Sequence, residues 1–249
     1  MINIRVIKGG ENLVSLIAST IRDKMMDNIF ENFERQEWEE KELIIILNKD
    51  GMDIEMWKER SRSNENVSIY QLSEEKTLGD CLNFGIEKAR YNIVAKFDDD
   101  DYYSPYYLTE AMRIFLTTDA QLVGKGKAFM YFEKEELLTI RKLGNENTVG
   151  KSSLKGGTII FKKEIYPKIK FPSIKGSGTD TKFVRLCKKE NIRIYTTSRY
   201  NYVYIRKANK NFHTFKRSNK KLKQTCEIVG TVSDYIPVIT KDFRNKNES

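Results

Sequence analysis

Apolar runs and helical spacing alternate through the first hundred residues, and this alternation restricts the fold more than any other feature of the sequence. Strand-like runs cover residues 14–18, 42–47, 67–72 and 91–97. Apolar side chains recur at helical spacing in residues 26–33, 54–60 and 78–89. Such alternation is typical of a mostly parallel sheet with helices on both faces. We therefore predict an α/β fold.

The second half of the chain has looser patterns of the same kind. Ser104 and Pro105 predict a helix start, with serine at the N-cap and proline at the first helical position. Further elements are expected in this order: a strand over 124–133, a polar loop over 142–151, a strand over 153–161, a helix over 181–191 and strand-rich residues 192–204. No internal repeat is visible, so one α/β unit accounts for the pattern.

Composition indicates how large a core the chain can bury and which charge its partners would carry. The chain has 249 residues, of which 39% are hydrophobic, enough for one large domain or two intimate halves. Lys and Arg number 44 and Asp and Glu 35, which gives a net charge of +9. This charge favours anionic partners such as nucleotides, nucleic acid, polyanionic glycans or an anionic membrane surface. A compositional bias toward lysine explains it equally well.

No feature of the sequence indicates secretion or a membrane span. The three cysteines, Cys81, Cys187 and Cys226, have neither metal-ligand nor disulfide spacing. The amino terminus lacks a signal-peptide core, and the longest aliphatic run, residues 43–47, is far too short to cross a bilayer. We predict a cytoplasmic protein without a transmembrane segment. The basic stretch 216–223 is either a solvated helix face or a contact for a membrane surface or another polyanion.

Four consecutive aspartates, Asp98–Asp101, directly follow the predicted strand 91–97. Ligands of open α/β sheets bind beyond the carboxyl ends of the strands, where the turns at Thr20 and Asn48 should also gather. Clustered carboxylates repel each other, and a divalent cation relieves that repulsion. If the segment is extended, Asp98 and Asp100 point one way and their neighbours the other. The alternative is a solvated acidic turn before the next helix.

Five ordered segments resemble the nucleotide-sugar half of glycosyltransferase family 2: residues 14–20, Gln36, residues 42–48, 78–86 and 96–101. Residues 156–158, 178–180 and 213–214 resemble a bacterial branch of that family. The resemblance implies a Rossmann-like GT-A fold in one domain, residues 1–215. Its nucleotide-sugar half would span about 12–101 and its acceptor half 102–215, followed by a basic extension over 216–249.

The resemblance also implies a donor site. Asp100 would coordinate Mn²⁺ or Mg²⁺ on the donor diphosphate in a DxD-type motif, helped by Asp98 or Asp101. His213, the only histidine, either completes the metal shell or is an ordinary surface residue. Thr20, Arg22, Asn48 and Asp50 would line the base and ribose pocket, and further donor contacts are expected from Asn83, Asp99 and Gly157. Asn48 stands where the family often has aspartate. Gly157 either lets the backbone approach the sugar or the acceptor closely, or simply forms a turn.

Asp180 occupies the place of the family's catalytic aspartate, although Thr179 replaces the acidic residue that usually precedes it. In this role it removes the proton from the acceptor nucleophile in a single, inverting displacement. The alternative role is the N-cap of the following helix. The donor would be a nucleoside-diphosphate sugar, with a UDP-sugar favoured, and the acceptor a glycan, a cell-wall polymer or a protein.

Two other functions remain open on the sequence. A nucleotidyltransferase uses a related sheet and paired carboxylates, but it usually has a Gly-rich basic loop after its first strand, where this chain has Ser19-Thr20-Ile21-Arg22. A protein that binds nucleic acid or another polyanion without catalysis would explain the net charge but not the four aspartates.

Overall fold

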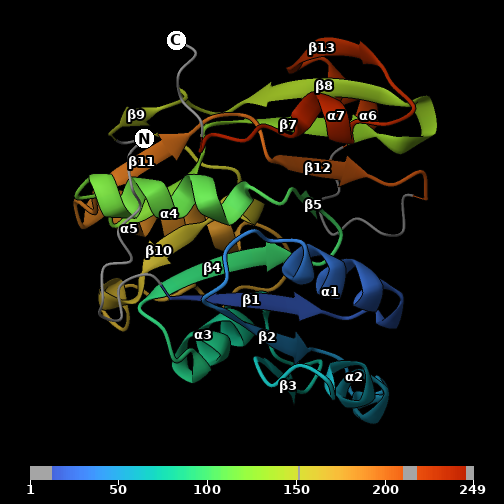
Figure 1. Ribbon diagram of the computed structural model, residues 1–249, viewed down its shortest axis with the longest axis vertical. Helices are drawn as coiled ribbons and strands as arrows, with labels where there is room; N and C mark the ends of the chain where they lie inside the picture. Colours follow the sequence, from blue (N-terminus) through green and yellow to red (C-terminus); the bar gives the residue numbers. More distant parts are fainter. Residues whose placement is uncertain (1–12, 151, 210–217, 245–249) are drawn as a thin grey trace.

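Two β-sheets organise the chain, as Figure 1 shows. The computed structural model describes residues 13–150, 152–209 and 218–244. The larger sheet has the strand order β3 (Val67–Gln71), β2 (Lys41–Leu47), β1 (Val14–Thr20), β4 (Ile93–Asp98), β10 (Ile160–Lys162), β6 (Leu122–Lys125), β11 (Ile194–Thr197), β9 (Thr148–Val149). The smaller sheet has the order β13 (Cys226–Thr231), β8 (Leu137–Lys142), β7 (Lys127–Phe132), β12 (Tyr202–Arg206), β5 (Tyr102–Tyr103).

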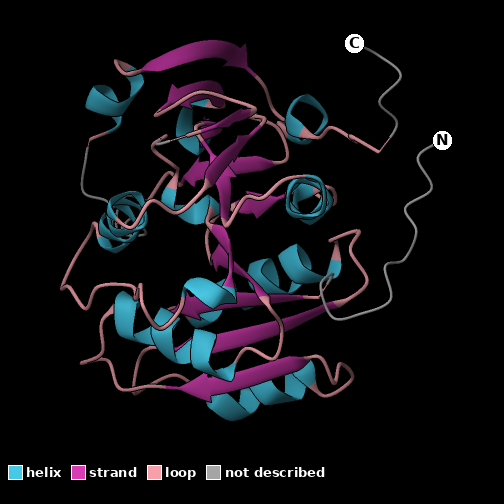
Figure 2. Cartoon of the chain, turned by 90° about the vertical axis from the view of Figure 1, so that its left-hand side faces the viewer, coloured by secondary structure: helices cyan, strands magenta, loops and turns pink. Residues whose placement is uncertain are grey.

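Helices cover both faces of the larger sheet, as the alternating pattern predicted (Figure 2). They are α1 (Met26–Glu34), α2 (Ile54–Ser61), α3 (Leu78–Lys88), α4 (Tyr107–Thr117) and α5 (Thr179–Lys189), with the short α6 (Asn219–Lys223) and α7 (Ile236–Ile239) near the smaller sheet. Leu16 packs in one core cluster with Phe30 and Trp57. Its neighbour Ile17 packs in a second cluster with Phe183. Successive side chains of a strand point to opposite faces, so β1 is buried on both sides.

The four strands β3, β2, β1 and β4 are parallel, so their carboxyl ends lie at one edge. The register places Ser19 beside Asp98 and Thr20 beside Leu47. β10 then pairs antiparallel with both β4 and β6. The sheet is therefore mixed and mostly parallel, and the predicted α/β fold class is confirmed.

Three boundaries in the second half differ from the prediction. The expected strand 124–133 divides at Gly126 into β6 and β7, which belong to different sheets. A Cβ on Gly126 would lie 2.1 Å from the carbonyl oxygen of Asn145, so only glycine allows this crossing. The expected strand 153–161 is mostly a loop with a 3₁₀ turn, η3 (Gly156–Thr158), before β10. The expected loop 142–151 contributes the short strand β9.

The helix predicted to start at Ser104 and Pro105 begins at Tyr107 instead. Ser104 does not cap it, because the Ser104 hydroxyl donates to Asn201 Oδ1 at 2.7 Å. The Ser104 side chain therefore links the segment before α4 to the residue before β12 of the smaller sheet, and it does not bind the first turn of α4.

The carboxyl-terminal residues pack onto the smaller sheet. β13 pairs antiparallel with β8, and Leu222 of α6 is buried. Lys220 and Lys221 are exposed, as both alternatives for the basic stretch require. Within the described ranges, no helix has the length and apolarity needed to cross a membrane.

A buried polar network joins α4 to the ends of β6 and β11. The Lys125 ammonium lies 3.0 Å from Glu110 Oε2, and it donates to Thr197 Oγ1 and to the Ser198 carbonyl at 3.1 and 2.8 Å. Both charged side chains are buried. No sequence pattern indicated this pair, since its partners lie far apart along the chain.

Replacing Lys125 with methionine is expected to lower the free energy of unfolding by about 3–5 kcal/mol, because it leaves a buried Glu110 carboxylate without its cation. Urea denaturation measures the change. Lys58→Met is the matched control, because Lys58 forms an exposed pair with Glu55, and its loss should cost at most about 1 kcal/mol. A loss no larger than that of Lys58→Met would contradict the expectation, because the buried pair would then stabilise the fold no more than an exposed one.

Candidate active site

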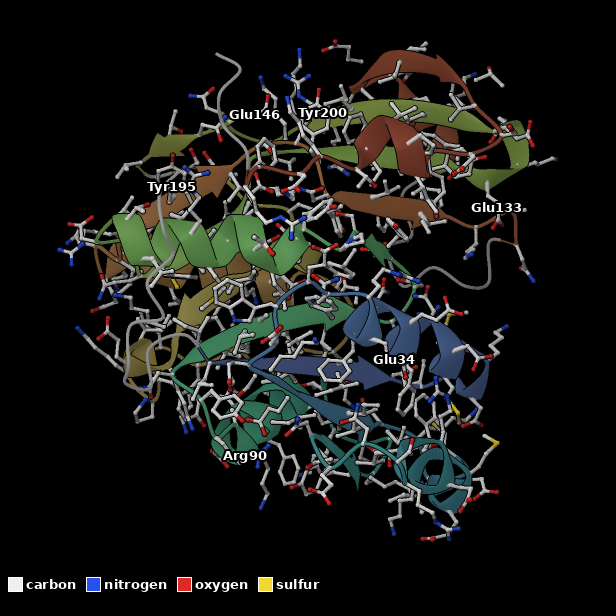
Figure 3. All side chains as sticks on the ribbon, viewed as in Figure 1. Glu34, Arg90, Glu133, Glu146, Tyr195 and Tyr200 are labelled. Atoms are coloured by element: carbon white, nitrogen blue, oxygen red, sulfur yellow. The ribbon has the colours of Figure 1, made fainter. Side chains whose placement is uncertain are left out.

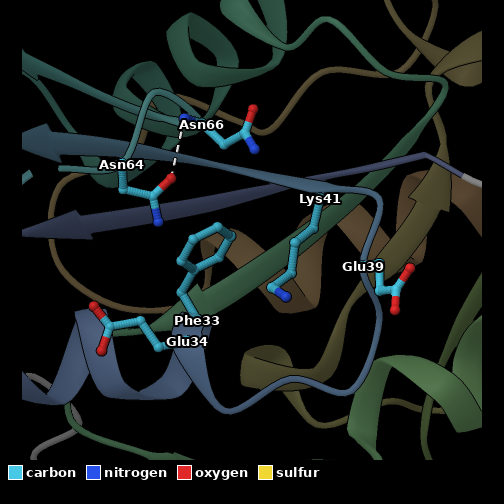
Figure 4. A pocket seen from close by; sticks show the side chains of 6 residues that line it. All are labelled: Phe33, Glu34, Glu39, Lys41, Asn64 and Asn66. Carbon is cyan, nitrogen blue, oxygen red and sulfur yellow. Dashed lines mark hydrogen bonds between the residues drawn. The ribbon is translucent and has the colours of Figure 1, made fainter.

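The acidic run lies at the carboxyl edge of the larger sheet, where β4 ends at Asp98 and a turn begins at Asp99. The end of β1 is its neighbour, so the turn after Thr20 gathers at this edge as expected. Thr20 and Arg22, which the resemblance assigned to the base and ribose pocket, contact the aspartates directly. Two surface hollows lie elsewhere. One is lined by Phe33, Glu34, Glu39, Lys41, Asn64 and Asn66 (Figure 4). The lining of the other includes Asn92 and Ile93, at the start of β4. The first includes Lys41, at the start of β2, so both hollows lie at the amino ends of strands.

The amino edge of the sheet holds a separate polar cluster that has no connection to the aspartates. Buried Glu42 accepts hydrogen bonds from Ser15 Oγ at 2.6 Å and from Arg90 Nε at 2.7 Å. Figure 3 shows Arg90 at the end of α3, well away from the end of β4. This cluster joins the starts of β1 and β2, and the acidic run lies at the opposite edge of the sheet.

Asp99 and Asp100 both face Arg22. Thr20 Oγ1 donates to Asp99 Oδ2 at 2.5 Å, and Arg22 Nε donates to the same oxygen at 3.1 Å. Arg22 Nη2 contacts Asp99 Oδ1 and also donates to Asp100 Oδ2 at 3.1 Å. Burial, followed by repulsion from Asp99, raises the pKa of Asp100 to about 6.

Asp101 is fully buried beneath the turn. Its Oδ2 accepts from the Tyr202 hydroxyl at 2.5 Å and its Oδ1 from the Ile205 amide at 3.2 Å. Burial raises the pKa of Asp101 well above the usual range. These contacts use both oxygens of the carboxylate from the protein side.

The predicted alternation of the four side chains is wrong. Because residues 99–101 form a turn rather than an extended strand, Asp99 and Asp100 share Arg22. Asp98 and Asp101 share the space beside Gly157, where an added Cβ would lie 2.6 and 2.9 Å from their Oδ2 atoms. The Tyr103 hydroxyl closes this side by donating to the Gly157 carbonyl at 2.6 Å and accepting from the Asp98 amide at 2.8 Å.

The contact at Gly157 gives a stability prediction. Gly157→Ala is expected to lower the free energy of unfolding by about 1–3 kcal/mol, because the methyl group overlaps Asp98, Asp101 and the Tyr202 hydroxyl. Thermal or urea unfolding measures it. Gly51→Ala is the control, since nothing lies within 4 Å of an added Cβ there, and its change should stay within about 0.5 kcal/mol. Equal stability of the two variants would mean that the turn at Gly157 shifts freely.

Asp180 reaches the aspartates from the first turn of α5. Gly178, and not Asp180, is the N-cap of this helix, so the N-cap alternative for Asp180 is wrong. The buried Lys96 ammonium pairs with Asp98 and lies 3.3 Å from Asp180 Oδ2. Asp180 Oδ1 is buried and has no hydrogen-bond partner among the described residues. Burial raises the pKa of Asp180, while the nearby Lys96 opposes the rise.

Three predicted donor residues hold loops of the same region without touching the aspartates. Asn48 Nδ2 donates to the Ser73 carbonyl at 2.9 Å, and Asp50 accepts from the Glu74 amide at 3.2 Å. The Asn83 side chain binds the backbone of Phe171 in both directions, at 2.8 and 3.0 Å. His213 lies outside the described residues.

Sequence reasoning did not single out two cations of the site, Lys96 and Lys155. A signal for Lys96 exists, since it is a charged residue inside an apolar strand, on the same face as Asp98 two positions later. Lys155 lies close enough to Asp101 and Asp98 for electrostatic attraction. Five carboxylates thus meet three cations, a formal excess of two negative charges: Asp98–Asp101 and Asp180 against Arg22, Lys96 and Lys155.

Comparisons with known proteins agree on one family. The family model described as "Glycosyl transferase family 2" matches residues 16–225. The O-antigen biosynthesis glycosyltransferase WbnJ of Escherichia coli is 30% identical over 162 residues, which are 62% of this chain and 63% of that protein.

Similar solved structures include S. aureus TarS 1–349 in complex with UDP-GlcNAc, with a TM-score of 0.62, 16% identity and coverage of 83% of this chain and 61% of that one. Another is the mannosyltransferase PcManGT from Pyrobaculum calidifontis in complex with GDP-Man and Mn²⁺, with a TM-score of 0.58, 14% identity and coverage of 80% and 58%. At these identities the likeness shows the fold alone. The chain spans less than two thirds of the length of each relative.

Proposed function

Because the chain belongs to glycosyl transferase family 2, we propose that it transfers a sugar from a nucleoside-diphosphate sugar to a glycan acceptor, with inversion at the anomeric carbon. The family and the GT-A fold expected from the sequence are both confirmed. The family match also favours glycosyl transfer over nucleotidyl transfer and over polyanion binding without catalysis. The observation behind the proposed reaction is Asp180 Oδ1, a buried carboxylate oxygen without a protein partner beside the acidic run.

The donor half of the site is residues 12–101 and the acceptor half residues 102–215. The first half supplies Thr20, Arg22 and the aspartates, and the second supplies Gly157 and Asp180. Asn48, Asp50 and Asn83 shape the nucleoside side of the edge by holding its loops. A UDP-sugar is the first candidate donor, since the TarS complex contains UDP-GlcNAc, and a GDP-sugar is the second.

A divalent cation, Mn²⁺ or Mg²⁺, fits this donor set. Among the described residues no three His, Cys, Asp or Glu side chains form a group able to hold a metal alone. Magnesium sites on nucleotides do not need one, because they use one or two carboxylates together with substrate phosphates. The formal excess of two negative charges favours a bound cation. Asp100 and Asp98 would hold it, with His213 as a further candidate ligand.

When bound, the cation neutralises the charge that develops on the leaving diphosphate. The remaining chemistry belongs to the chain. Asp180 accepts the proton of the acceptor hydroxyl as that oxygen attacks the anomeric carbon from the side opposite the diphosphate. Lys96 holds Asp180 Oδ2, so that Oδ1 is the oxygen left for the proton. Arg22 keeps Asp99 in place and so fixes the turn that presents Asp100.

The acceptor is proposed to be a glycan because the WbnJ relative acts in O-antigen biosynthesis; a cell-wall polymer or a protein is the alternative. The cytoplasmic location and a membrane or polyanion contact through residues 216–223 stay predictions from the sequence.

Calorimetric titration with UDP, GDP, CDP, dTDP and ADP, each with and without Mn²⁺, tests the donor site. We expect one of the five to bind, and to bind much more tightly with the metal. The matching sugar nucleotides then identify the reaction, and NMR of the product reads its anomeric configuration. Metal-independent binding, or none at all, would overturn the proposed donor site, and retention of configuration would overturn the proposed mechanism.

A further inference from the structure

Lys155 is a cation of the site that neither the family motif nor the proposed mechanism uses. It directly precedes η3, and its amide donates to the Lys125 carbonyl at 2.9 Å, which anchors its backbone to the end of β6. Its ammonium lies 3.5 Å from the ring centroid of Tyr204. Tyr204 is two residues after Tyr202 on β12, so both rings face the same side. Because Tyr202 binds Asp101, the Lys155 ammonium lies on the face of β12 that points toward the acidic turn.

The three cations of the site differ in how the protein satisfies them. Arg22 binds Asp99 and Asp100, and Lys96 binds Asp98 and Asp180. The Lys155 ammonium, half-buried on the aromatic face, makes no hydrogen bond or ion pair to any described residue. Asp101 and Asp98 attract it only from a distance, while burial lowers its pKa. An ammonium removed from water gains from a direct anionic partner, and the protein does not supply one here.

We propose that Lys155 binds the diphosphate of the nucleotide donor. This inference rests on the proposed function. A diphosphate entering among five aspartates needs cations, and Lys155 is the one of the three that makes no such contact with the described chain. During transfer the bond from the anomeric carbon to the diphosphate oxygen breaks and its electron pair stays on that oxygen. The acceptor oxygen forms the new bond and its proton passes to Asp180. Lys155 stabilises the charge left on the diphosphate.

The test compares nucleotide binding by three variants in the presence of Mn²⁺, using calorimetry with the five nucleoside diphosphates and their monophosphates. Lys155→Met keeps the apolar stem and removes the charge, so the affinity for the diphosphate should fall about 10- to 100-fold. The loss should be smaller for the monophosphate. Lys155→Arg keeps the charge and should restore most of the affinity. Lys88→Met is the control, because Lys88 also lies over aromatic rings, those of Tyr70 and Phe84, but on α3.

The outcomes distinguish a failure of the role of Lys155 from a failure of the proposed donor site. If wild type binds a nucleoside diphosphate and folded Lys155→Met binds it equally well, the role of Lys155 is wrong while the donor site stands. An unchanged donor affinity with a raised acceptor KM would assign Lys155 to the acceptor instead, and also overturn the inference. If wild type binds none of the five, the proposed function falls and this inference falls with it. Should Lys155→Met unfold, Lys155→Gln provides the uncharged variant.

Discussion

Asp180→Asn is expected to lower kcat by about 10²- to 10⁴-fold, the usual contribution of a general base. Asparagine keeps the shape of the side chain but cannot accept the acceptor proton. The donor should bind with nearly unchanged affinity, because Asp180 lies on α5 and not on the loops after β1 and β2. Initial rates over a range of donor and acceptor concentrations, with calorimetry for the nucleotide, measure both effects.

Two features of the structure make this variant informative. Lys96 keeps its second carboxylate, Asp98, so the buried ammonium remains paired and the fold should survive. Asp119→Asn is the matched control, because Asp119 is an exposed aspartate bound to Arg193, and its kcat should match that of wild type. A kcat for Asp180→Asn within about tenfold of wild type would exclude Asp180 as the base, since such a base contributes at least 10²-fold.

The edge of the sheet that holds the site could be predicted from the sequence because it depends on local patterns. Apolar runs define β1, β2 and β4, and parallel strands must end at one edge. The contact of Thr20 and Arg22 with the aspartates follows from that rule, although these residues lie 77 or more positions apart. The apolar run before Asp98 also located the acidic run at a strand end.

The orientation of individual side chains could not be predicted, because it depends on tertiary contacts. The acidic run turns after Asp98, where Asn28 and Asn32 of α1 bind the carbonyls of Asp99 and Asp101. That turn overrides the alternation expected of a strand. In the same way, Phe171 uses both ends of the Asn83 amide, a pairing across 88 positions that no local pattern encodes.

The second half was harder for a related reason. The sequence 124–133 begins with alternating glycine and lysine and continues into the apolar run 128–132, and nothing in this pattern marks Gly126 as the crossing between two sheets. The crossing follows from the close approach of Asn145, a residue of a separate loop. Lys155 belongs to the same region, and its place beside Tyr204 depends on how η3 packs against β12.

Asp100→Asn is expected to weaken metal-dependent nucleotide binding by more than about 100-fold. Loss of a residue that only orients a metal ligand typically costs 10- to 100-fold in affinity, so loss of a direct carboxylate ligand should exceed that range. The side chain of Asp100 is partly open to solvent and, among the residues that the structure describes, binds only Arg22, which leaves it accessible to a cation. Titration of the nucleotide with and without Mn²⁺, on wild type and variant, measures the effect.

The variant Asp99→Asn distinguishes loss of binding caused by a missing metal ligand from loss caused by a changed turn. Asp99 uses both oxygens on Thr20 and Arg22, so its loss should weaken binding by a similar factor with and without Mn²⁺. Asp100→Asn should instead abolish the difference between the two conditions and reproduce wild type in EDTA. If Asp100→Asn keeps a full response to Mn²⁺, the metal lies elsewhere. Asp98 and His213 would then be the ligands to replace, because Asp101 already has both oxygens bound by Tyr202 and the Ile205 amide.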